Sequence, residues 1–470
     1  MAYRQFEVES TEEQPERAVL VGVDRGDLDW PLEESLAELE RLVNTAGAQV
    51  VGSISQRMET PNPRTFIGPG KADELAALVQ RLDVNLVVFD DELTPSQQSN
   101  LEKLLGKPVK VIDRTALILD IFALHATTKE GRLQVRLAQN QYLYPRLRGM
   151  WSHLASNRMG GGVGSRFGEG ESQLEVDRRL VRKRISRIRN ELKDVAQSRA
   201  TQRKSRKDGS IFRIALAGYT NAGKSSLMNR LTGAQVLAYD KLFATLDSTT
   251  RRLELDAGPC VTLTDTVGFI QKLPTSLVES FHSTLEEIRE ADLILLVVDT
   301  SSPQRDQQVK AVREVLGQIE AAKIETVLVY NKIDLCGEGE LAHLAQLEPE
   351  AAFVSAVTGE GAQELLERIT QAVLARDPLV EVLIPYAQGR FVQMAHERAH
   401  VEHEEYREDG TFMRLRIPAP VLPSFAPFAT GKDALAYAHV GKSDEELDEM
   451  AGILRAGGTA RRLSTNTGNP

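Results

Sequence analysis

The chain contains few of the residues on which several classes of protein depend. Cysteine occurs twice in 470 residues, as Cys260 and Cys336. The two lie far apart in or beside apolar segments, which favours packing roles over a disulfide and predicts a reducing compartment. No apolar run approaches the roughly 20 residues that a membrane-spanning helix needs, and the first residues lack the apolar core of a secretory signal. We therefore expect a cytoplasmic protein without a membrane span, although the sequence leaves peripheral contact with a membrane open.

Basic residues are outnumbered over the chain as a whole, but not everywhere. The chain carries 57 lysines and arginines against 67 aspartates and glutamates, a net charge of −10. Spread evenly, this charge would argue against a nucleic-acid partner. Residues 146–207, however, contain 17 basic and 6 acidic side chains. Because clustered lysines and arginines neutralise phosphates, this region predicts contact with RNA, with a solvated helix face as the alternative.

Alternating apolar and helical patterns predict two domains in the first half of the chain. Over residues 1–113, β-rich runs such as 18–23 and 49–54 alternate with helical patterns, which predicts an N-terminal parallel α/β domain. Residues 114–208 predict a helical hairpin, interrupted by the glycine-rich segment 158–171. Its second helix, expected from Ser172 onwards, has a narrow apolar seam of Leu174, Leu180, Val181, Ile185, Ile188, Leu192 and Val195.

Two further domains are expected in the second half. Residues 209–377 begin with a strand that leads directly into a glycine-rich loop and a helix, and later strands alternate with helices. This pattern predicts a G domain with a doubly wound, mostly parallel sheet. Residues 378–470 predict a small α+β unit followed by a disordered tail. The expected fold class is therefore α/β in several domains.

The glycine-rich loop matches the phosphate-binding pattern G-x-x-x-x-G-K-[ST]. Its residues are Gly218, Tyr219, Thr220, Asn221, Ala222, Gly223, Lys224 and Ser225. Successive backbone N–H groups and the N-terminus of the following helix can surround phosphates, and the glycines allow close approach. We expect the Lys224 ammonium to bind the β- and γ-phosphates and the Ser225 hydroxyl to be a Mg²⁺ ligand. Since a strand precedes the loop and a helix follows it, a chance glycine turn is a poor alternative.

Three later motifs favour guanine as the base. They are Asp265-Thr266-Val267-Gly268, Asn331-Lys332-Ile333-Asp334 and Ser355-Ala356-Val357, and each follows a predicted strand. The Asp265 carboxylate is expected to hold Mg²⁺, with the Gly268 amide near the γ-phosphate. Asp334 can accept hydrogen bonds from N1–H and the 2-amino group of guanine, whereas adenine would leave that carboxylate unpaired. The Ala356 amide is expected to bind guanine O6. Four motifs in this order predict a GTPase that converts GTP to GDP.

Beyond these motifs, the chain resembles the HflX family of translation-factor-class GTPases, which belongs to the Obg-HflX group. The resemblance rests on TFIGPGK (65–71), GGGVGSRFGEGESQLEVDRR (160–179), LFATLDSTTRR (242–252) and DTVGFIQKLP (265–274). It covers nearly the whole chain and is weakest over the last ninety residues. It implies a protein that binds the large (50S) ribosomal subunit and its rRNA and uses GTP to split or rescue stalled ribosomes.

The resemblance also assigns a first switch segment. By position this segment is Phe243, Ala244, Thr245, Leu246 and Asp247, with Thr245 as the expected Mg²⁺ ligand. Thr249 and Thr250 remain alternatives for that ligand. Ser248 departs from the family pattern, because it stands where a proline is expected. The position of Asn221 resembles that of the asparagine in potassium-dependent GTPases, which makes K⁺ a further candidate cofactor.

One expected catalytic residue is missing. Phe269 follows Gly268, at the position where Ras-like GTPases carry the glutamine that orients the attacking water. An apolar side chain cannot orient water, so we expect slow intrinsic turnover until a partner changes the site. The catalytic groups are then expected to be Lys224, Thr245 and Gly268. Phe269→Ala is expected to leave hydrolysis in place.

Other interpretations of the sequence stay open. A GTPase chaperone of ribosome assembly or RNA remodelling would carry the same nucleotide site. His396-Glu397-Arg398-Ala399-His400 matches H-E-x-x-H, which on one helix can bind Zn²⁺ in a hydrolase, although no third ligand is obvious. Gly68-Pro69-Gly70-Lys71 predicts a tight turn before a helix better than it predicts a phosphate loop. The resemblance leaves open a second nucleotide in the N-terminal domain.

Overall fold

The computed structural model describes residues 15–26, 30–106, 108–150, 167–206, 211–233, 242–243, 245–255, 261–272, 282–418 and 421–430. By their internal contacts, residues 1–200, 214–250 and 263–361 form one compact unit, and residues 201–213, 251–262 and 362–470 form another. No helix in the described ranges is long and apolar enough to cross a membrane. Cys336 is a free, partly buried thiol, and Cys260 lies outside the described residues.

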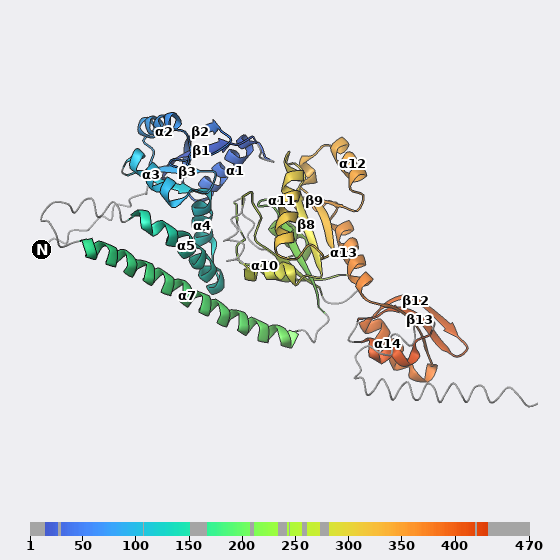
Figure 1. Cartoon of the computed structure of the whole chain (residues 1–470). Coiled ribbons are helices and arrows are strands. Elements are labelled where there is room, and N and C mark those ends of the chain that lie inside the picture. The colour runs from blue at the N-terminus through green and yellow to red at the C-terminus, as the bar shows by residue number, and fades with distance from the viewer. Residues whose placement is uncertain are drawn as a thin grey trace, which may run out of the picture. The chain divides into compact units, whose positions relative to one another are not determined.

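The N-terminal domain is a four-stranded parallel sheet with helices packed on it (Figure 1). The strands β1 (Arg17–Asp24), β2 (Gln49–Arg57), β3 (Leu86–Phe89) and β4 (Lys110–Asp113) lie in the order β2-β1-β3-β4. They alternate with α1 (Leu32–Thr45), α2 (Pro69–Arg81) and α3 (Pro95–Leu105). The predicted parallel sheet is confirmed. The helix α2 begins directly after Gly68, as the interpretation of the 68–71 segment as a turn predicts.

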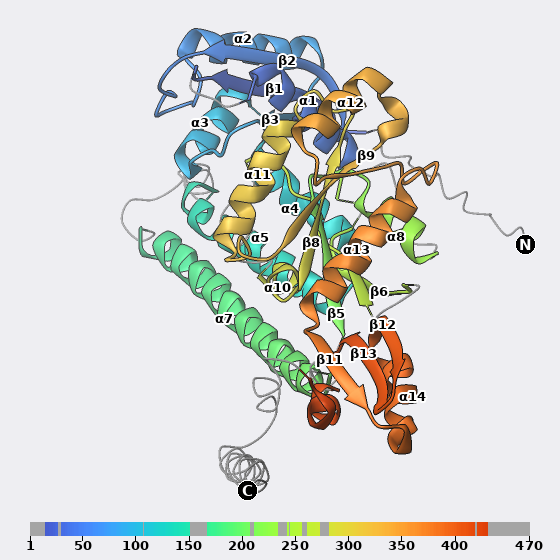
Figure 2. The ribbon, with the colours of Figure 1, turned by 90° about the vertical axis from the view of Figure 1, so that its right-hand side faces the viewer.

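The helical region consists of α4 (Arg114–His125), α5 (Lys129–Met150) and the long α7 (Phe167–Arg206) (Figure 2). Helix α7 begins five residues before the expected Ser172, because extending an existing helix through Gly168 and Gly170 costs only about 1 kcal/mol per glycine. The apolar seam is partly confirmed. Ile185, Ile188 and Leu192 pack on α5, whereas the Leu180 side chain is 54% exposed. Residues 158–166 of the glycine-rich segment lie outside the described residues.

The G domain contains a six-stranded sheet in the order β10-β9-β8-β5-β7-β6. The strands are β5 (Phe212–Gly218), β6 (Thr249–Leu253), β7 (Val261–Asp265), β8 (Leu293–Asp299), β9 (Thr326–Asn331) and β10 (Ala352–Val354). The helices are α8 (Lys224–Thr232), α10 (His282–Arg289), α11 (Arg305–Gln318), α12 (Glu338–Leu347) and α13 (Ala362–Arg376). The pairs β5–β8, β8–β9 and β9–β10 are parallel. Strand order reverses at β5, and the parallel strands bring the motifs that follow β5, β9 and β10 to one edge, where such sheets bind ligands.

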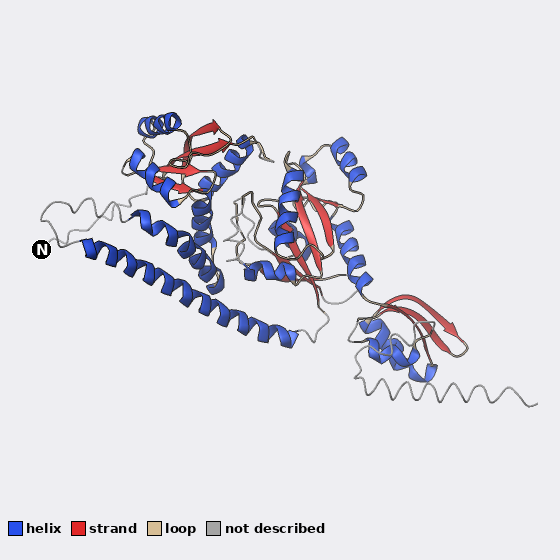
Figure 3. Ribbon diagram, in the orientation of Figure 1, coloured by secondary structure: helices blue, strands red, loops and turns tan. Residues whose placement is uncertain are grey.

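The last described residues form a small α+β unit (Figure 3). The strands β11 (Leu379–Ile384), β12 (His400–Arg407) and β13 (Gly410–Arg416) form an antiparallel sheet in the order β11-β13-β12, and α14 (Gly389–Arg398) packs against it. A single turn, α15 (Leu422–Phe425), follows. The interpretation of H-E-x-x-H as a metal site fails here, because α14 ends at Arg398 and His400 already belongs to β12. The two histidines therefore do not share a helical face.

A continuous apolar cluster runs through the first compact unit. It includes Leu39 and Leu42 of α1 together with much of α4, the side chains of Leu242, Phe243 and Leu246, and core residues of the G-domain sheet. Within this unit, the N-terminal domain and α4 share a core with the first switch segment. The nucleotide loops are therefore packed against other domains and not only against their own sheet.

Candidate nucleotide site

The phosphate loop connects β5 to α8, as the sequence predicts. The loop leaves the sheet at Gly218, and α8 begins at Lys224. Gly223 has a φ of +88°, and a Cβ added there would overlap Nδ2 of Asn331. Only glycine fits this left-handed, crowded position. The loop backbone and the first amides of α8 thus lie at one edge of the sheet, where they can surround an anion.

Three side-chain oxygens converge beside the phosphate loop. Ser225 Oγ lies 2.6 Å from Asp265 Oδ2, and Thr245 Oγ1 lies 2.9 Å from each of these oxygens. Asp265 is fully buried, its Oδ1 has no hydrogen-bond partner, and burial raises the pKa of its carboxyl despite Lys224 nearby. A buried carboxylate with an unpaired oxygen beside two hydroxyls fits Mg²⁺, which prefers hard oxygen ligands.

Thr249 and Thr250, the alternatives to Thr245 as Mg²⁺ ligand, lie in β6 and not in this cluster of oxygens. Thr250 Oγ1 is 3.0 Å from Thr264 Oγ1.

Lys224 is buried, and its Nζ donates to the carbonyls of Gly218 and Tyr219 at 3.1 and 2.9 Å. Burial lowers the pKa of Lys224 to about 8, against the charge of Asp265, which raises it. The Lys224 ammonium is thus enclosed by the phosphate loop, where it is expected to bind the β- and γ-phosphates.

The predicted base-binding loops are tied to the phosphate loop. Asn331 donates from Nδ2 to the Ala222 carbonyl at 2.8 Å and accepts at Oδ1 from the Ala356 amide at 3.0 Å. Lys332 donates to Asp299 at 2.7 Å. The sequence assigned the Ala356 amide to guanine O6, and the structure gives it a partner in Asn331. That role stays a prediction.

The remaining residues of these motifs have distinct surroundings. Asp334 lies exposed in a turn of 3-10 helix, Ile333–Leu335, while Ile333 is buried. Ser355 is fully buried and accepts from the Thr358 amide, whereas the Val357 side chain is 74% exposed. Thr266 donates to the Leu216 carbonyl at 2.6 Å. Thr266, Ile333 and Ser355 therefore hold the loops in place, and Asp334 is the carboxylate accessible to a base.

The first switch segment packs on α4 and the start of α5. The Phe243 ring meets that of Phe122 edge-on, with centroids 4.7 Å apart, and Leu246 is buried. Asp247 accepts hydrogen bonds from the residues that precede α5. Burial opposes ionisation of Asp247, but the hydrogen bonds from Thr128 and Thr127 outweigh it and hold its pKa below the usual range. Ala244 lies outside the described residues.

The segment after Asp265 pairs with the phosphate loop. The Thr220 amide donates to the Phe269 carbonyl at 2.7 Å, and the Phe269 amide donates to the Gly218 carbonyl at 3.1 Å. The Phe269 side chain is 1% exposed and belongs to the core. Truncating a buried phenylalanine to alanine costs about 3–5 kcal/mol. We therefore do not expect Phe269→Ala to leave hydrolysis in place, because the truncation would reduce the fraction of protein that is folded.

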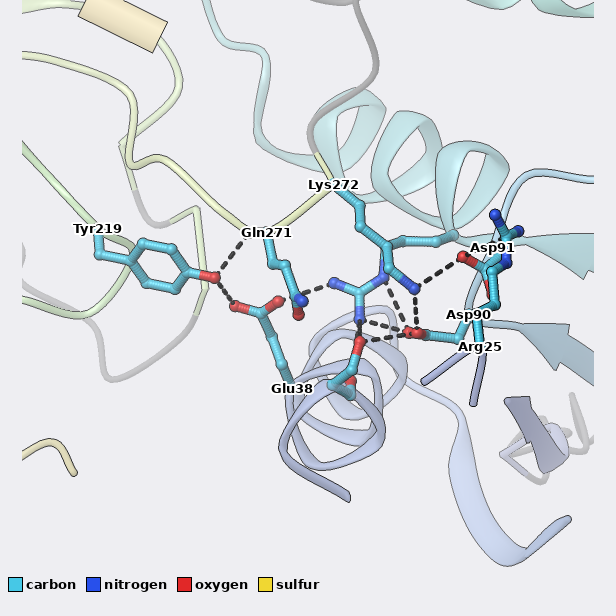
Figure 4. A network of polar contacts seen from close by, with 9 residues as sticks. Arg25, Glu38, Asp90, Asp91, Tyr219, Gln271 and Lys272 are labelled. Carbon is cyan, nitrogen blue, oxygen red and sulfur yellow. Dashed lines mark hydrogen bonds and ion pairs between the residues drawn. The ribbon is translucent and has the colours of Figure 1, made fainter. Parts of the chain in front are cut away.

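A buried polar network joins this segment to the N-terminal domain (Figure 4). The Tyr219 hydroxyl donates to the Glu38 carboxylate at 2.6 Å and accepts from the backbone N–H of Gln271 at 2.6 Å. Arg114 pairs with both Glu38 and Asp90, and the Lys272 ammonium lies 2.6 Å from Asp90. Burial alone would raise the pKa of Asp90, but Arg114 and Lys272 lower it. One guanidinium shared by two buried carboxylates needs a second cation, which Lys272 supplies.

Sequence reasoning missed this network and the partners of Asp247. Some signals were present. Arg114 is a charged residue directly before the largely apolar run TALILDIFAL, and Asp90 follows a strand at the carboxyl edge of a parallel sheet. The pair Thr127-Thr128 before α5 is a helix-capping signal. None of these signals identifies its partner, because the partners lie between 24 and 181 residues away in sequence and on other elements.

Taken together, a phosphate loop between strand and helix, a buried aspartate beside it and an N-K-x-D turn define a GTP-binding P-loop protein. Family models match most of the chain: "GTP-binding GTPase N-terminal" at 33–123, "GTP-binding GTPase Middle Region" at 125–206, "50S ribosome-binding GTPase" at 213–332 and "HflX C-terminal domain" at 340–419. The chain belongs to the HflX family of GTPases, and its enzymatic activity is GTP hydrolysis.

Individual relatives agree with this assignment. The chain is 44% identical to GTPase HflX of Lacrimispora saccharolytica over 87% of this chain and 96% of the relative. It is 42% identical to GTPase HflX of Escherichia coli over 82% and 90% of the two chains. Among solved structures, a GTP-binding protein from Sulfolobus solfataricus in complex with GDP covers 76% of this chain and 98% of its own, at 23% identity and a TM-score of 0.41.

Proposed function

We propose that GTP hydrolysis by this chain depends on Mg²⁺ and that its GTP-bound form binds the large ribosomal subunit through α7. The family description supports the ribosomal partner, and a ribosomal partner would place the protein in the cytoplasm. The observation that supports the proposal most is the placement of α7. This helix has exposed basic side chains and packs on α5, and the residues before α5 contact the first switch segment. Splitting or rescue of stalled ribosomes is the role that fits this combination, with GTP hydrolysis ending the bound state.

The proposed chemistry follows from the converging oxygens. Ser225, Thr245 and Asp265 would hold Mg²⁺, the last through a water molecule. Bound there, the ion would neutralise charge that develops on the phosphates. Lys224 would bind the β- and γ-phosphate oxygens, and the Gly268 amide would donate to the γ-phosphate. Asn221 is exposed at the tip of the loop with a φ of +60°, and K⁺ as a cofactor stays a prediction from the sequence.

Phe269 does not take the place of a water-orienting glutamine. Phe269 points into the core, and its backbone is fixed to Gly218 and Thr220. The γ-phosphate side of the site therefore has backbone donors and Lys224 but no acidic or amide side chain from this position. We propose that contact with the ribosome completes the site, which makes intrinsic turnover slow and stimulated turnover faster.

Helix α7 supplies the proposed RNA contact. Arg179, Lys183, Arg184 and Arg189 are exposed, while Ile185 and Ile188 pack towards α5. The apolar seam thus fixes one side of the helix, and these four basic side chains are exposed on the remainder. Arg182 and Arg187 have intramolecular partners as well: Arg182 lies over the Tyr144 ring, and Arg187 pairs with Glu191. Those two are poor choices for a test, because changing them would also alter contacts within the hairpin.

Replacing Arg179, Arg184 and Arg189 with glutamate is expected to weaken binding to the large subunit at least tenfold. Each phosphate that the helix no longer neutralises should also flatten the dependence of log affinity on log salt by roughly 0.7–0.9, or about 2–3 in total. GTP affinity should be unchanged, because these side chains lie outside the nucleotide site. The measurement is subunit binding across a salt series, together with nucleotide affinity.

A matched control carries the same change in charge away from α7. Lys103, Arg313 and Lys323 are exposed in other elements, and their replacement by glutamate should leave the salt slope near that of the wild type. Equal losses in both triple variants would mean that total charge, and not α7, governs binding. Wild-type binding by the α7 variant would move the RNA contact to another part of the chain.

A further inference from the structure

The carboxylate of Asp247, in the first switch segment, accepts four hydrogen bonds from the two residues that precede α5. Its Oδ2 accepts from the amides of Thr127 and Thr128, both at 2.8 Å, and from Thr127 Oγ1 at 2.7 Å. Its Oδ1 accepts from Thr128 Oγ1 at 2.5 Å. A charged acceptor that collects several aligned donors forms stronger bonds than a neutral one.

This contact joins the switch to the start of a helix. Thr128 caps α5, since its Oγ1 accepts from the Gly131 amide at 2.9 Å and its carbonyl accepts from the Arg132 amide at 3.1 Å. Asp247 therefore adds a negative charge at the N-terminus of a 22-residue helix, where the helix dipole favours it. The capping residue and the switch residue form one hydrogen-bonded group.

Gly131 makes room for the carboxylate. A Cβ added at this position would overlap Asp247 Oδ1, so no other residue fits there without displacing Asp247. Because glycine is otherwise unfavourable within a helix, its presence in the first turn of α5 has a cost that this contact explains.

The contact lies next to the proposed Mg²⁺ ligand. Thr245 is two residues before Asp247 and two residues after Phe243, whose ring packs on Phe122 of α4. Both sides of Thr245 are therefore attached to the helical region. Helix α5 in turn packs on the basic helix α7 through Leu133, Leu137 and Ile188.

We propose that Asp247 is a positioning residue that keeps Thr245 beside Ser225 and Asp265 by anchoring the first switch segment to the N-terminus of α5. The proposal rests on the function proposed for Thr245. Coupling of this kind is reciprocal, so a nucleotide that closes the switch also orders the start of α5, and a partner that binds the hairpin also affects the switch.

Two variants break the contact from opposite sides. Asp247→Ala removes the acceptor, whereas Gly131→Ala retains Asp247 and displaces it with a methyl group, while improving the intrinsic helix propensity of α5. In both, kcat for GTP should fall about tenfold to a hundredfold, as expected for a misplaced catalytic group. KM for GTP and affinity for GDP should change little, because neither depends on Thr245 alone. Retained GDP affinity also shows that the variants are folded.

A second readout does not depend on activity. In the wild type, the amides of Thr127 and Thr128 should exchange hydrogen more slowly with a non-hydrolysable GTP analogue and Mg²⁺ than with GDP. Both variants should lose that difference. Gly317→Ala is the matched control, because an alanine Cβ at this exposed site in α11 meets nothing within 4 Å. It should behave as the wild type in both measurements.

The outcomes separate this inference from the proposed function. If Thr245→Ala stops Mg²⁺-dependent hydrolysis while Asp247→Ala and Gly131→Ala keep wild-type kcat and wild-type exchange, Asp247 is not a positioning residue. If Thr245→Ala itself hydrolyses GTP as the wild type does, the assignment of Thr245 as a ligand is wrong, and the role proposed for Asp247 falls with it.

Discussion

Asp265→Asn is expected to reduce Mg²⁺-dependent GTP hydrolysis by at least about 10²–10³-fold. The Asp265 carboxylate is buried, lies 2.6 Å from Ser225 Oγ and 2.9 Å from Thr245 Oγ1, and has an unpaired Oδ1. Asparagine keeps the size of the side chain but removes the charge that would hold the ion. Stabilisation by a metal ion is worth several kcal/mol, and about 3–4 kcal/mol corresponds to this loss in rate.

The measurement is kcat across a Mg²⁺ titration, with GDP affinity as a check on folding. Asp306→Asn is the control, because Asp306 is an exposed acid in the first turn of α11. It should hydrolyse GTP at the wild-type rate. A wild-type Mg²⁺ dependence in Asp265→Asn would place the metal elsewhere and remove the assignment of Ser225 and Thr245 together with it.

Asp334→Asn is expected to lower GTP affinity by roughly 10²–10⁴-fold and to increase affinity for xanthosine triphosphate. The carboxylate would accept two hydrogen bonds from guanine, each worth about 1.5–3 kcal/mol for a charged acceptor. Asparagine presents a donor in place of one acceptor, which opposes the 2-amino group of guanine and suits the 2-oxo group of xanthine. Because Asn331 and Lys332 are each held by neighbouring residues, the turn should keep its position in the variant.

Competition binding with the two nucleotides checks this exchange of preference. Glu338→Gln removes a charge from the first turn of α12, four residues further along the chain, and should leave base preference unchanged. If Asp334→Asn binds GTP as tightly as the wild type and shows no increase in affinity for xanthosine triphosphate, Asp334 does not determine base selectivity.

The parts of the site that were predictable from sequence are those whose residues are contiguous. The phosphate loop, the segment beginning at Asp265 and the turn around Asp334 each follow a strand, and parallel strands bring such loops to one edge of a sheet. The alternation of strands and helices predicted both parallel sheets for the same reason. The local sequence pattern was sufficient to predict these parts, because the order and direction of the strands decide which loops lie next to one another.

Other features depend on contacts between distant segments, and local pattern does not reveal them. Glu38 meets Tyr219 across 181 residues, and Asp247 meets Thr127 across 120. Burial of Phe269 depends on the core that the first compact unit shares, so its position after Gly268 was not enough to predict the effect of truncating it. The end of α14 at Arg398 likewise separates two histidines that the H-E-x-x-H spacing places together.

The most direct test of the central claim is sedimentation of intact ribosomes with the wild-type chain in the presence of a non-hydrolysable GTP analogue or of GDP. The account predicts that ribosomes separate into subunits and that the protein sediments with the large subunit, with the analogue but not with GDP. Binding confined to precursor particles would instead favour a role in assembly. Equal sedimentation with both nucleotides, or no association with the large subunit, would contradict the account.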